Sequence, residues 1–227
     1  MKLVIGNKNY SSWSMRPWVL MRQAGIPFEE LKLSFAHGLD TDGPFKRELA
    51  RYSGAGRVPV LLLDNGHAVW DTLAIAETLA ELFAHKQLWP ADPRSRALAR
   101  SACAEMHSGF VDLRTHFPMN IEASLPEVGP RVMAENAGVR ADVARLVSLW
   151  GELLVRSGGP LLFGTFTIAD AYFAPVCMRV RTYGIALPPA LEAYVDRVLA
   201  LPGVAAWRAD ALAENEFVEF DEPYRTR

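Results

Sequence analysis

The sequence predicts two domains of different class, a small α/β domain followed by an all-helical domain. Its 227 residues exceed the usual size of one domain, roughly 100 to 150 residues. Every convincing strand-like run lies before Trp89, and after Pro93 only long stretches rich in Ala, Leu, Val and Arg remain. We therefore place the domains at 1–86 and 93–227.

The first domain alternates strands and helices in the order βαβαββα. Short apolar runs predict strands at 3–5, 28–34, 57–63 and 68–70, and helical spacing predicts helices at 15–23, 45–51 and 72–82. Gly25 and Pro27 end the first of these helices. Asn65-Gly66 between the last two strands is a strong hairpin signal.

The second domain contains no convincing strand. The predicted helices cover 93–117, 127–157, 167–183, 189–200 and 203–214, with Pro or Gly clusters in the gaps. Thr167 and Asp170 have the spacing of a capping box, in which each side chain bonds the backbone of the other residue. We interpret this pair as a helix start and not as a catalytic pair.

Composition and charge exclude several classes of function. The net charge is −2 with a pI near 6.2, and basic residues are scattered, which argues against a nucleic-acid partner. Charged residues interrupt every candidate membrane span, and the apolar start is too short for a secretory signal. Cys103 and Cys177 form no close-spaced metal or redox motif, so we expect two buried thiols and a cytoplasmic protein.

Three short segments of the first domain carry the candidate chemistry. They are the turn Ser11-Ser12-Trp13-Ser14, the pair Val58-Pro59 at the mouth of the third strand, and the pair Asp71-Thr72 at the start of the third helix. Taken alone, each has an ordinary structural explanation: a polar turn, an edge-strand proline and a helix cap. Together, and followed by a helical domain, they resemble the cytosolic glutathione transferases, with a turn most similar to zeta-class and other serine-type members.

This resemblance implies a glutathione transferase fold, with a thioredoxin-like domain built on a mixed four-stranded sheet and an all-α domain behind it. It also implies glutathione as co-substrate. Val58, before a cis Pro59, would pair its backbone with the cysteinyl part of glutathione, and Asp71-Thr72 would receive the γ-glutamyl end.

The serine turn is where the resemblance places the reaction. A hydroxyl that donates to sulfur stabilises the thiolate, which is the nucleophilic form of a thiol. Aligning the turn through Ser14 and Arg16 puts Ser11 at the catalytic position, with Ser12 as its rival and Ser14 as a helix cap. Trp13, beside the bound glutathione, replaces the zeta-class cysteine.

The glycyl carboxylate of glutathione lacks its usual partner. Relatives carry a lysine shortly before the Val-Pro pair, whereas Gly56 stands there in this chain. Arg57 is a candidate to supply the charge, and His37 and Arg47 are two others.

The resemblance further implies an electrophile site against the helix at 93–117. His107 and His116 lie there, Tyr172 is a candidate for the same cleft, and Met106, Phe110, Leu113 and Phe117 form a stripe that suits either a cleft wall or the core.

The leading hypothesis is transfer of glutathione to a small apolar electrophile. The alternatives are isomerisation of the maleylacetoacetate type and a binding protein without catalysis. Family members usually form homodimers, so the resemblance implies a homodimer here as well.

Overall fold

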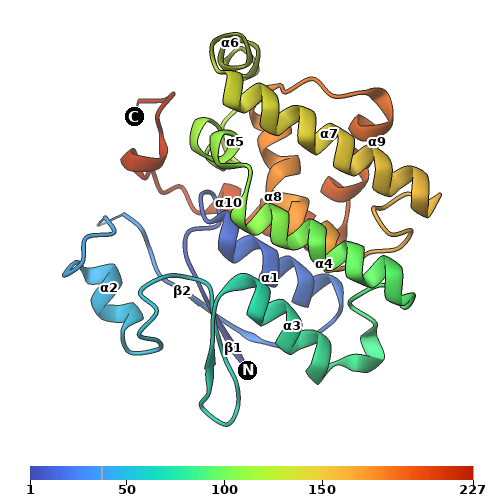
Figure 1. Cartoon of the computed structure of the whole chain (residues 1–227). Coiled ribbons are helices and arrows are strands. Elements are labelled where there is room, and N and C mark those ends of the chain that lie inside the picture. Colours follow the sequence, from blue (N-terminus) through green and yellow to red (C-terminus); the bar gives the residue numbers. More distant parts are fainter. Residues whose placement is uncertain (37, 227) are drawn as a thin grey trace.

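A computed structural model describes residues 1–36 and 38–226 of the chain. His37, one of the three candidates for the glycyl carboxylate, lies outside the described residues. The described part folds as an α/β domain followed by a helical domain (Figure 1).

The first domain is built on four short strands, β1 (Lys2–Ile5), β2 (Glu29–Lys32), β3 (Val60–Leu62) and β4 (Ala68–Val69). Their order in the sheet is β2-β1-β3-β4. β1 runs parallel to β2 and antiparallel to β3, and β3 runs antiparallel to β4. The predicted mixed four-stranded sheet is therefore confirmed.

Helices cover both faces of this sheet because its apolar residues alternate in direction. Leu3, Ile5 and Leu61 belong to the large core cluster with α1 (Ser12–Gln23) and α3 (Thr72–Leu82). Val4 and Val60 belong to a second cluster with Phe45 and Leu49 of α2 (Pro44–Leu49). A short 3₁₀ helix, η1 (Ala84–Lys86), leads out of the domain.

The second domain consists of seven helices within the described residues. They are α4 (Pro93–Ser108), α5 (Val111–His116), α6 (Val128–Glu135), α7 (Ala137–Ser157), α8 (Ile168–Tyr183), α9 (Pro189–Leu199) and α10 (Pro202–Ala213). Helix α8 is buried along nearly its whole length and begins with the predicted capping box, in which the Thr167 N–H donates to Asp170 Oδ2 at 2.9 Å. A 3₁₀ turn, η2 (Glu219–Asp221), follows α10.

Two predicted long helices are each divided in the structure. Helix 93–117 breaks at Gly109 and Phe110, where Phe110 adopts a left-handed backbone with φ of 53° while its ring is buried. Helix 127–157 breaks at Asn136, whose side chain accepts from the Val139 N–H and caps α7. Tertiary burial and a local cap thus prevail over helical spacing at these positions.

The two domains share one continuous core. Residues of α1, α3, α4 and α8 belong to a single buried cluster, and the rings of Trp18 in α1 and Trp207 in α10 lie 5.3 Å apart. Cys103 and Cys177 are fully buried as predicted, and burial raises the pKa of both thiols. No helix in the described part of the chain is long and apolar enough to cross a bilayer.

Candidate functional site

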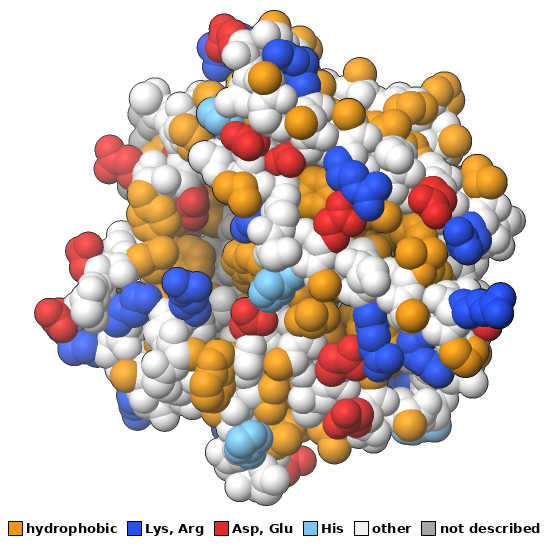
Figure 2. Space-filling model, in the orientation of Figure 1, with side chains coloured by type: hydrophobic (Ala, Val, Ile, Leu, Met, Phe, Trp, Pro, Cys, Tyr) orange, Lys and Arg blue, Asp and Glu red, His pale blue; other side chains and the backbone are white. Residues whose placement is uncertain are grey.

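A cavity of about 320 Å³ lies between the serine turn and the helical domain. Figure 2 shows the corresponding face hollowed left of centre, with hydrophobic and basic side chains around the opening. The cavity is lined by residues of both domains, namely Tyr10, Ser11, Ser12, Trp13, Phe35, Leu39, Phe45, Lys46, Gly56, Arg57, Val58, Arg114, Pro118, Met119, Arg179 and Asp221. The structure therefore brings together five of the predicted site residues: Ser11, Ser12, Trp13, Arg57 and Val58.

The serine turn forms the start of α1, three residues earlier than predicted. Ser11 is the residue at the N-cap position and donates through Oγ to Ser14 Oγ at 2.7 Å. Ser14 lies inside the helix, and its Oγ also accepts from the Gly6 N–H at the end of β1. The predicted role of Ser14 as the helix cap is wrong, because Ser14 instead ties the turn to the sheet.

Ser12 has a different partner, from the second domain. Its Oγ accepts from Arg179 Nη2 at 3.2 Å. Arg179 lies in the middle of α8, is 3% exposed, and also donates to the carbonyl oxygens of Phe117 and Pro175. A buried guanidinium thus lies directly behind the turn.

Three arginines surround Trp13 and the serine turn. The Arg16 guanidinium lies 4.1 Å and that of Arg114 5.5 Å from the Trp13 ring centroid. Burial lowers the pKa of Arg16 to about 10 and that of Arg179 to about 9, so both stay charged at neutral pH. Among residues 1–36 and 38–226, no carboxylate hydrogen-bonds any of the three, and Arg16 Nη1 and Nη2 have no partner. This group is called the arginine cluster below.

The predicted Val58-Pro59 peptide bond is cis, as the resemblance implied. Pro59 is buried, whereas Val58 is half-buried and lines the cavity beside the exposed Arg57. Val58 thus lines the cavity two residues before the start of β3.

Asp71 and Thr72 lie next to the cavity lining, not within it. Asp71 caps α3 by accepting from the Leu73 N–H at 3.4 Å, and its other oxygen, Oδ2, lies 3.3 Å from His107 Nε2. Thr72 is 1% exposed and donates through Oγ1 to the carbonyl oxygen of Trp13. Asp71 therefore acts as an ordinary helix cap, and Thr72 joins α3 to the serine turn.

A lysine occupies the space left by Gly56. Lys46 of α2 lines the cavity and donates through Nζ to the Gly56 carbonyl oxygen. A Cβ on Gly56 would stand 3.7 Å from the same ammonium. Arg47, the neighbouring candidate, donates to the Asp42 carbonyl instead and does not line the cavity.

The predicted cleft residues of the second domain mostly belong to the core. Met106, Phe110, Leu113 and Phe117 are all at most 5% exposed and lie in the large cluster. Tyr172 is buried, with its hydroxyl 3.0 Å from His107 Nδ1. His116 pairs with Asn136. None of these residues lines the cavity, so the expectation that Tyr172 faces it is wrong.

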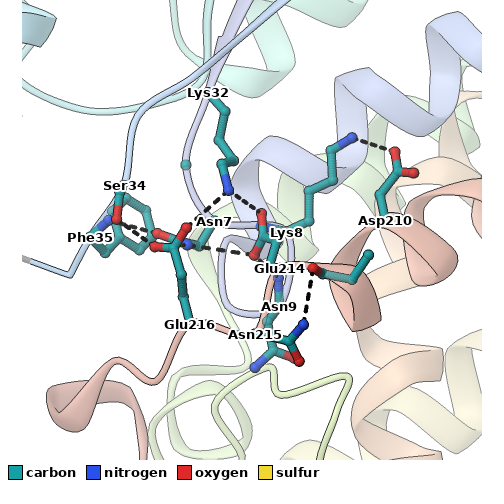
Figure 3. A network of polar contacts seen from close by, with 12 residues as sticks. Asn7, Lys8, Asn9, Lys32, Ser34, Phe35, Asp210, Glu214, Asn215 and Glu216 are labelled. Atoms are coloured by element: carbon teal, nitrogen blue, oxygen red, sulfur yellow. Dashed lines mark hydrogen bonds and ion pairs between the residues drawn. The ribbon is translucent and has the colours of Figure 1, made fainter.

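The segment after α10 returns to the first domain and holds the loop before the serine turn. Figure 3 shows Glu214, which accepts from the Lys8 N–H at 2.8 Å and the Asn9 N–H at 3.2 Å. Glu216 Oε2 accepts from the Asn7 amide at 2.9 Å. These contacts fix the backbone that leads into Ser11.

The same segment then closes one side of the cavity. Figure 1 shows it in red, and the Tyr224 hydroxyl donates to the carbonyl oxygen of His116 at the end of α5. Glu222 accepts from the Tyr10 hydroxyl at 2.6 Å, and burial together with this carboxylate raises the pKa of Tyr10 to about 12. Asp221 lines the cavity itself, and burial raises its pKa to about 6.

Sequence reasoning missed Lys46, Arg114, Arg179 and Asp221. For Arg179 a signal was present, because a charged residue stood in the apolar run that becomes α8. The other three lie in ordinary polar surroundings, and nothing local distinguished them.

Two family models match the sequence. The model of the glutathione S-transferase N-terminal domain matches residues 10–82, and that of the C-terminal domain matches residues 133–210. Together the matches span more than half of the chain. No curated protein sequence gives a significant match.

Solved structures of the same fold cover almost the whole chain. A glutathione transferase homologue from Burkholderia gl BGR1, with bound glutathione, is 25% identical, with a TM-score of 0.69 over 92% of this chain and 97% of its own. BphK, a bacterial glutathione S-transferase, is 24% identical, with a TM-score of 0.68 over 93% of this chain and 100% of its own. A tau-class enzyme from mango, Mangifera indica, is 18% identical with a TM-score of 0.68, covers 93% of this chain and 95% of its own, and supports the fold alone.

Proposed function

The chain belongs to the glutathione S-transferase family, and on this basis we propose that it binds glutathione in the interdomain cavity and adds the thiolate to a small electrophile. The observation that carries the proposal is the shared cavity, which Ser11, Ser12 and Val58 line together. The Burkholderia relative was crystallised with glutathione, which supports the same ligand here.

The proposed pose follows from the groups around the cavity. The backbone of Val58 pairs with the cysteinyl residue, and Asp71 at the start of α3 meets the γ-glutamyl ammonium. The Thr72 amide, at the positive end of α3, suits the γ-glutamyl carboxylate. This places the sulfur at the turn formed by Ser11 and Ser12.

Lys46 is our choice for the glycyl carboxylate. Its ammonium lies at Gly56, where relatives carry a lysine, and it faces the cavity. Arg57 borders the same space and is a second cation for this end of the ligand.

The reaction needs little from the protein beyond binding and charge stabilisation. A serine hydroxyl of the turn donates to the thiolate, which lowers the thiol pKa and keeps the nucleophile charged. The sulfur then forms a bond to the electrophilic carbon, and a leaving group such as a halide departs with its electron pair. Phe35, Leu39 and Met119 offer apolar surface to such an electrophile.

The direct test combines affinity and turnover. We expect calorimetry to show glutathione binding and a haloarene to be conjugated in proportion to enzyme. Absence of glutathione binding at millimolar concentration would contradict the proposal and favour a binding protein of another kind.

A second candidate activity is isomerisation of the maleylacetoacetate type. Arg114 and Arg179 both line the cavity, and two guanidiniums suit a substrate with two carboxylates. Turnover of maleylacetoacetate with glutathione in catalytic amount would select this activity over conjugation.

We also propose a cytoplasmic homodimer, as is usual in the family. Trp70 beside β4 and Leu82 at the end of α3 are both about half exposed and offer apolar surface. Light scattering that gives the mass of a single chain at micromolar concentration would contradict the dimer.

A further inference from the structure

The hydrogen bond between Arg179 and Ser12 determines what the Ser12 hydroxyl can do. A guanidinium has five N–H donors and no acceptor, so Ser12 Oγ must accept from Arg179 Nη2. The hydroxyl proton of Ser12 therefore needs an acceptor elsewhere. Because Ser12 lines the cavity, a ligand atom there is in position to accept it.

Ser11 is placed differently, although it borders the same cavity. Its Oγ shares a hydrogen bond of 2.7 Å with Ser14 Oγ, which also accepts from the Gly6 N–H, so its partner in the turn is uncharged. Ser12 Oγ instead accepts from a guanidinium, and a hydroxyl that accepts from a charged donor becomes a stronger donor itself. Of the two serines, Ser12 is therefore the stronger donor to a ligand in the cavity.

The charge around the turn favours an anion beside Ser12. Burial lowers the pKa of Arg16, Arg114 and Arg179, and the charge of Arg114 further lowers the pKa of the other two. No carboxylate in the described part of the chain hydrogen-bonds any of the three. An opposite charge within a few ångströms typically shifts a pKa by about 1 to 3 units towards the charged form. A thiol bound next to Ser12 is therefore placed to lose its proton easily.

We propose that Arg179 is a positioning residue, which holds Ser12 rather than Ser11 as the donor to the glutathione sulfur and, with the arginine cluster, supplies the charge that stabilises the thiolate. The inference rests on the proposed function, because it requires glutathione in the cavity. It reverses the preference for Ser11 that the sequence favoured.

The step is a simple deprotonation. The S–H bond of glutathione breaks, its electron pair stays on sulfur, and the proton leaves to bulk water through the open cavity. Ser12 keeps its own proton and shares it with the thiolate. No other reactant is needed.

The test measures the pKa of the glutathione thiol when it is bound to the protein. The ultraviolet absorbance of the enzyme-bound thiolate, followed against pH, gives the pKa of the bound thiol in the parent chain and in Ser11→Ala, Ser12→Ala, Arg179→Met and Ser12→Ala/Arg179→Met. The ionisable groups facing Arg179 are Arg16 from α1, Arg114 from α5, Tyr183 from α8 and Asp221 from η2, and all stay unchanged in these variants.

We expect Ser12→Ala and Arg179→Met each to raise the bound thiol pKa by about 1 unit or more, and Ser11→Ala to raise it much less. Because Arg179 acts partly through Ser12, the pKa shifts of the two single variants should sum to more than the pKa shift of the double variant. In Arg179→Lys the pKa of the bound thiol should lie between those of the parent chain and Arg179→Met. Arg181→Met is the matched control, since Arg181 lies two residues further on α8 and pairs with Glu192 and Asp196 at the surface.

The outcomes separate this inference from the proposed function. A thiol pKa that is lowered in the parent chain but moves only in Ser11→Ala would overturn the role of Ser12 and leave the transferase proposal intact. A parent chain that does not bind glutathione would overturn both. If Arg179→Met does not fold, the comparison of Ser11→Ala with Ser12→Ala still decides between the two serines.

Discussion

His107 Nε2 lies 3.3 Å from Asp71 Oδ2, so helix α4 of the second domain contacts the carboxylate that caps α3 of the first. The other ring nitrogen, Nδ1, lies 3.0 Å from the Tyr172 hydroxyl. The histidine thereby holds the Asp71 carboxylate between two domains, beside the end of the cavity proposed for the γ-glutamyl group.

His107→Ala should weaken glutathione binding without affecting the chemical step. Asp71 would lose the group that orients it, and a partly exposed pair of this kind is worth about 0.2 to 1 kcal/mol. We expect KM for glutathione to rise up to about fivefold at constant kcat. Steady-state kinetics with His85→Ala as an exposed control checks this, and an unchanged KM would count against the role of Asp71.

Lys46→Met should lower the affinity for glutathione by removing the cation at its glycyl end. We expect KM to rise about 1.5-fold to 5-fold, because the loss of one solvent-accessible ion pair costs about 0.2 to 1 kcal/mol. Arg47→Met on the same helix is the control, because Arg47 does not line the cavity. With a glutathione analogue whose glycyl carboxylate is an amide, the parent chain and Lys46→Met should bind equally; a remaining difference would argue for another role of Lys46.

Glu214→Ala should destabilise the fold. The side chain is 6% exposed and accepts from two backbone N–H groups, those of Lys8 and Asn9, which would be left without this acceptor. Charged hydrogen bonds of this kind contribute about 1.5 to 3 kcal/mol each, so we expect the loss of both to lower the free energy of unfolding by about 3 to 6 kcal/mol. Urea denaturation measures it, and Glu219→Ala in the exposed start of η2 should change little.

Asp221→Asn should stabilise the protein above pH 6. Burial raises the pKa of this carboxyl to about 6, against about 3.9 in an unfolded chain. Between about pH 3.9 and pH 6 the carboxyl is ionised in the unfolded chain but still protonated in the folded one. Raising the pH through this range therefore lowers the free energy of unfolding of the parent chain, and the loss is complete above pH 6.

The measurement is the difference in unfolding free energy between Asp221→Asn and the parent chain from pH 4 to pH 8. We expect it to grow through this range to at least about 1 kcal/mol, since one pKa unit corresponds to about 1.4 kcal/mol. Asp42→Asn, in the exposed loop before α2, controls for the general change in charge. A difference that is flat with pH would contradict the raised pKa.

The sheet and most helices could be predicted because their information is local. Val60–Leu62 and Lys2–Ile5 are short apolar runs bounded by polar turns, and Thr167 with Asp170 marks the start of α8 within four residues. The left-handed backbone at Phe110 could not be predicted, because it depends on the burial of one ring among residues far along the chain.

Much of the site lay beyond local information for the same reason. Arg179 and Ser12 are 167 residues apart, and only the packing of α8 against α1 brings them together. Lys46 reaches the cavity because Gly56 has no side chain to occupy that place. Ser11, Val58 and Asp71 were found because a resemblance, not a pattern of spacing, pointed to them.

The contact between Lys8 and Glu214 has a consequence for the order in which the molecule forms. Glu214 follows Lys8 by 206 residues. During synthesis the loop that contains Lys8 therefore lacks this hydrogen-bond acceptor until nearly all of the described residues have left the ribosome. The sheet and α1 can assemble early, but the backbone before Ser11 acquires these partners only after the segment that follows α10 has been synthesised. We therefore expect an isolated 1–86 fragment, even if it folds, to lack an ordered serine turn.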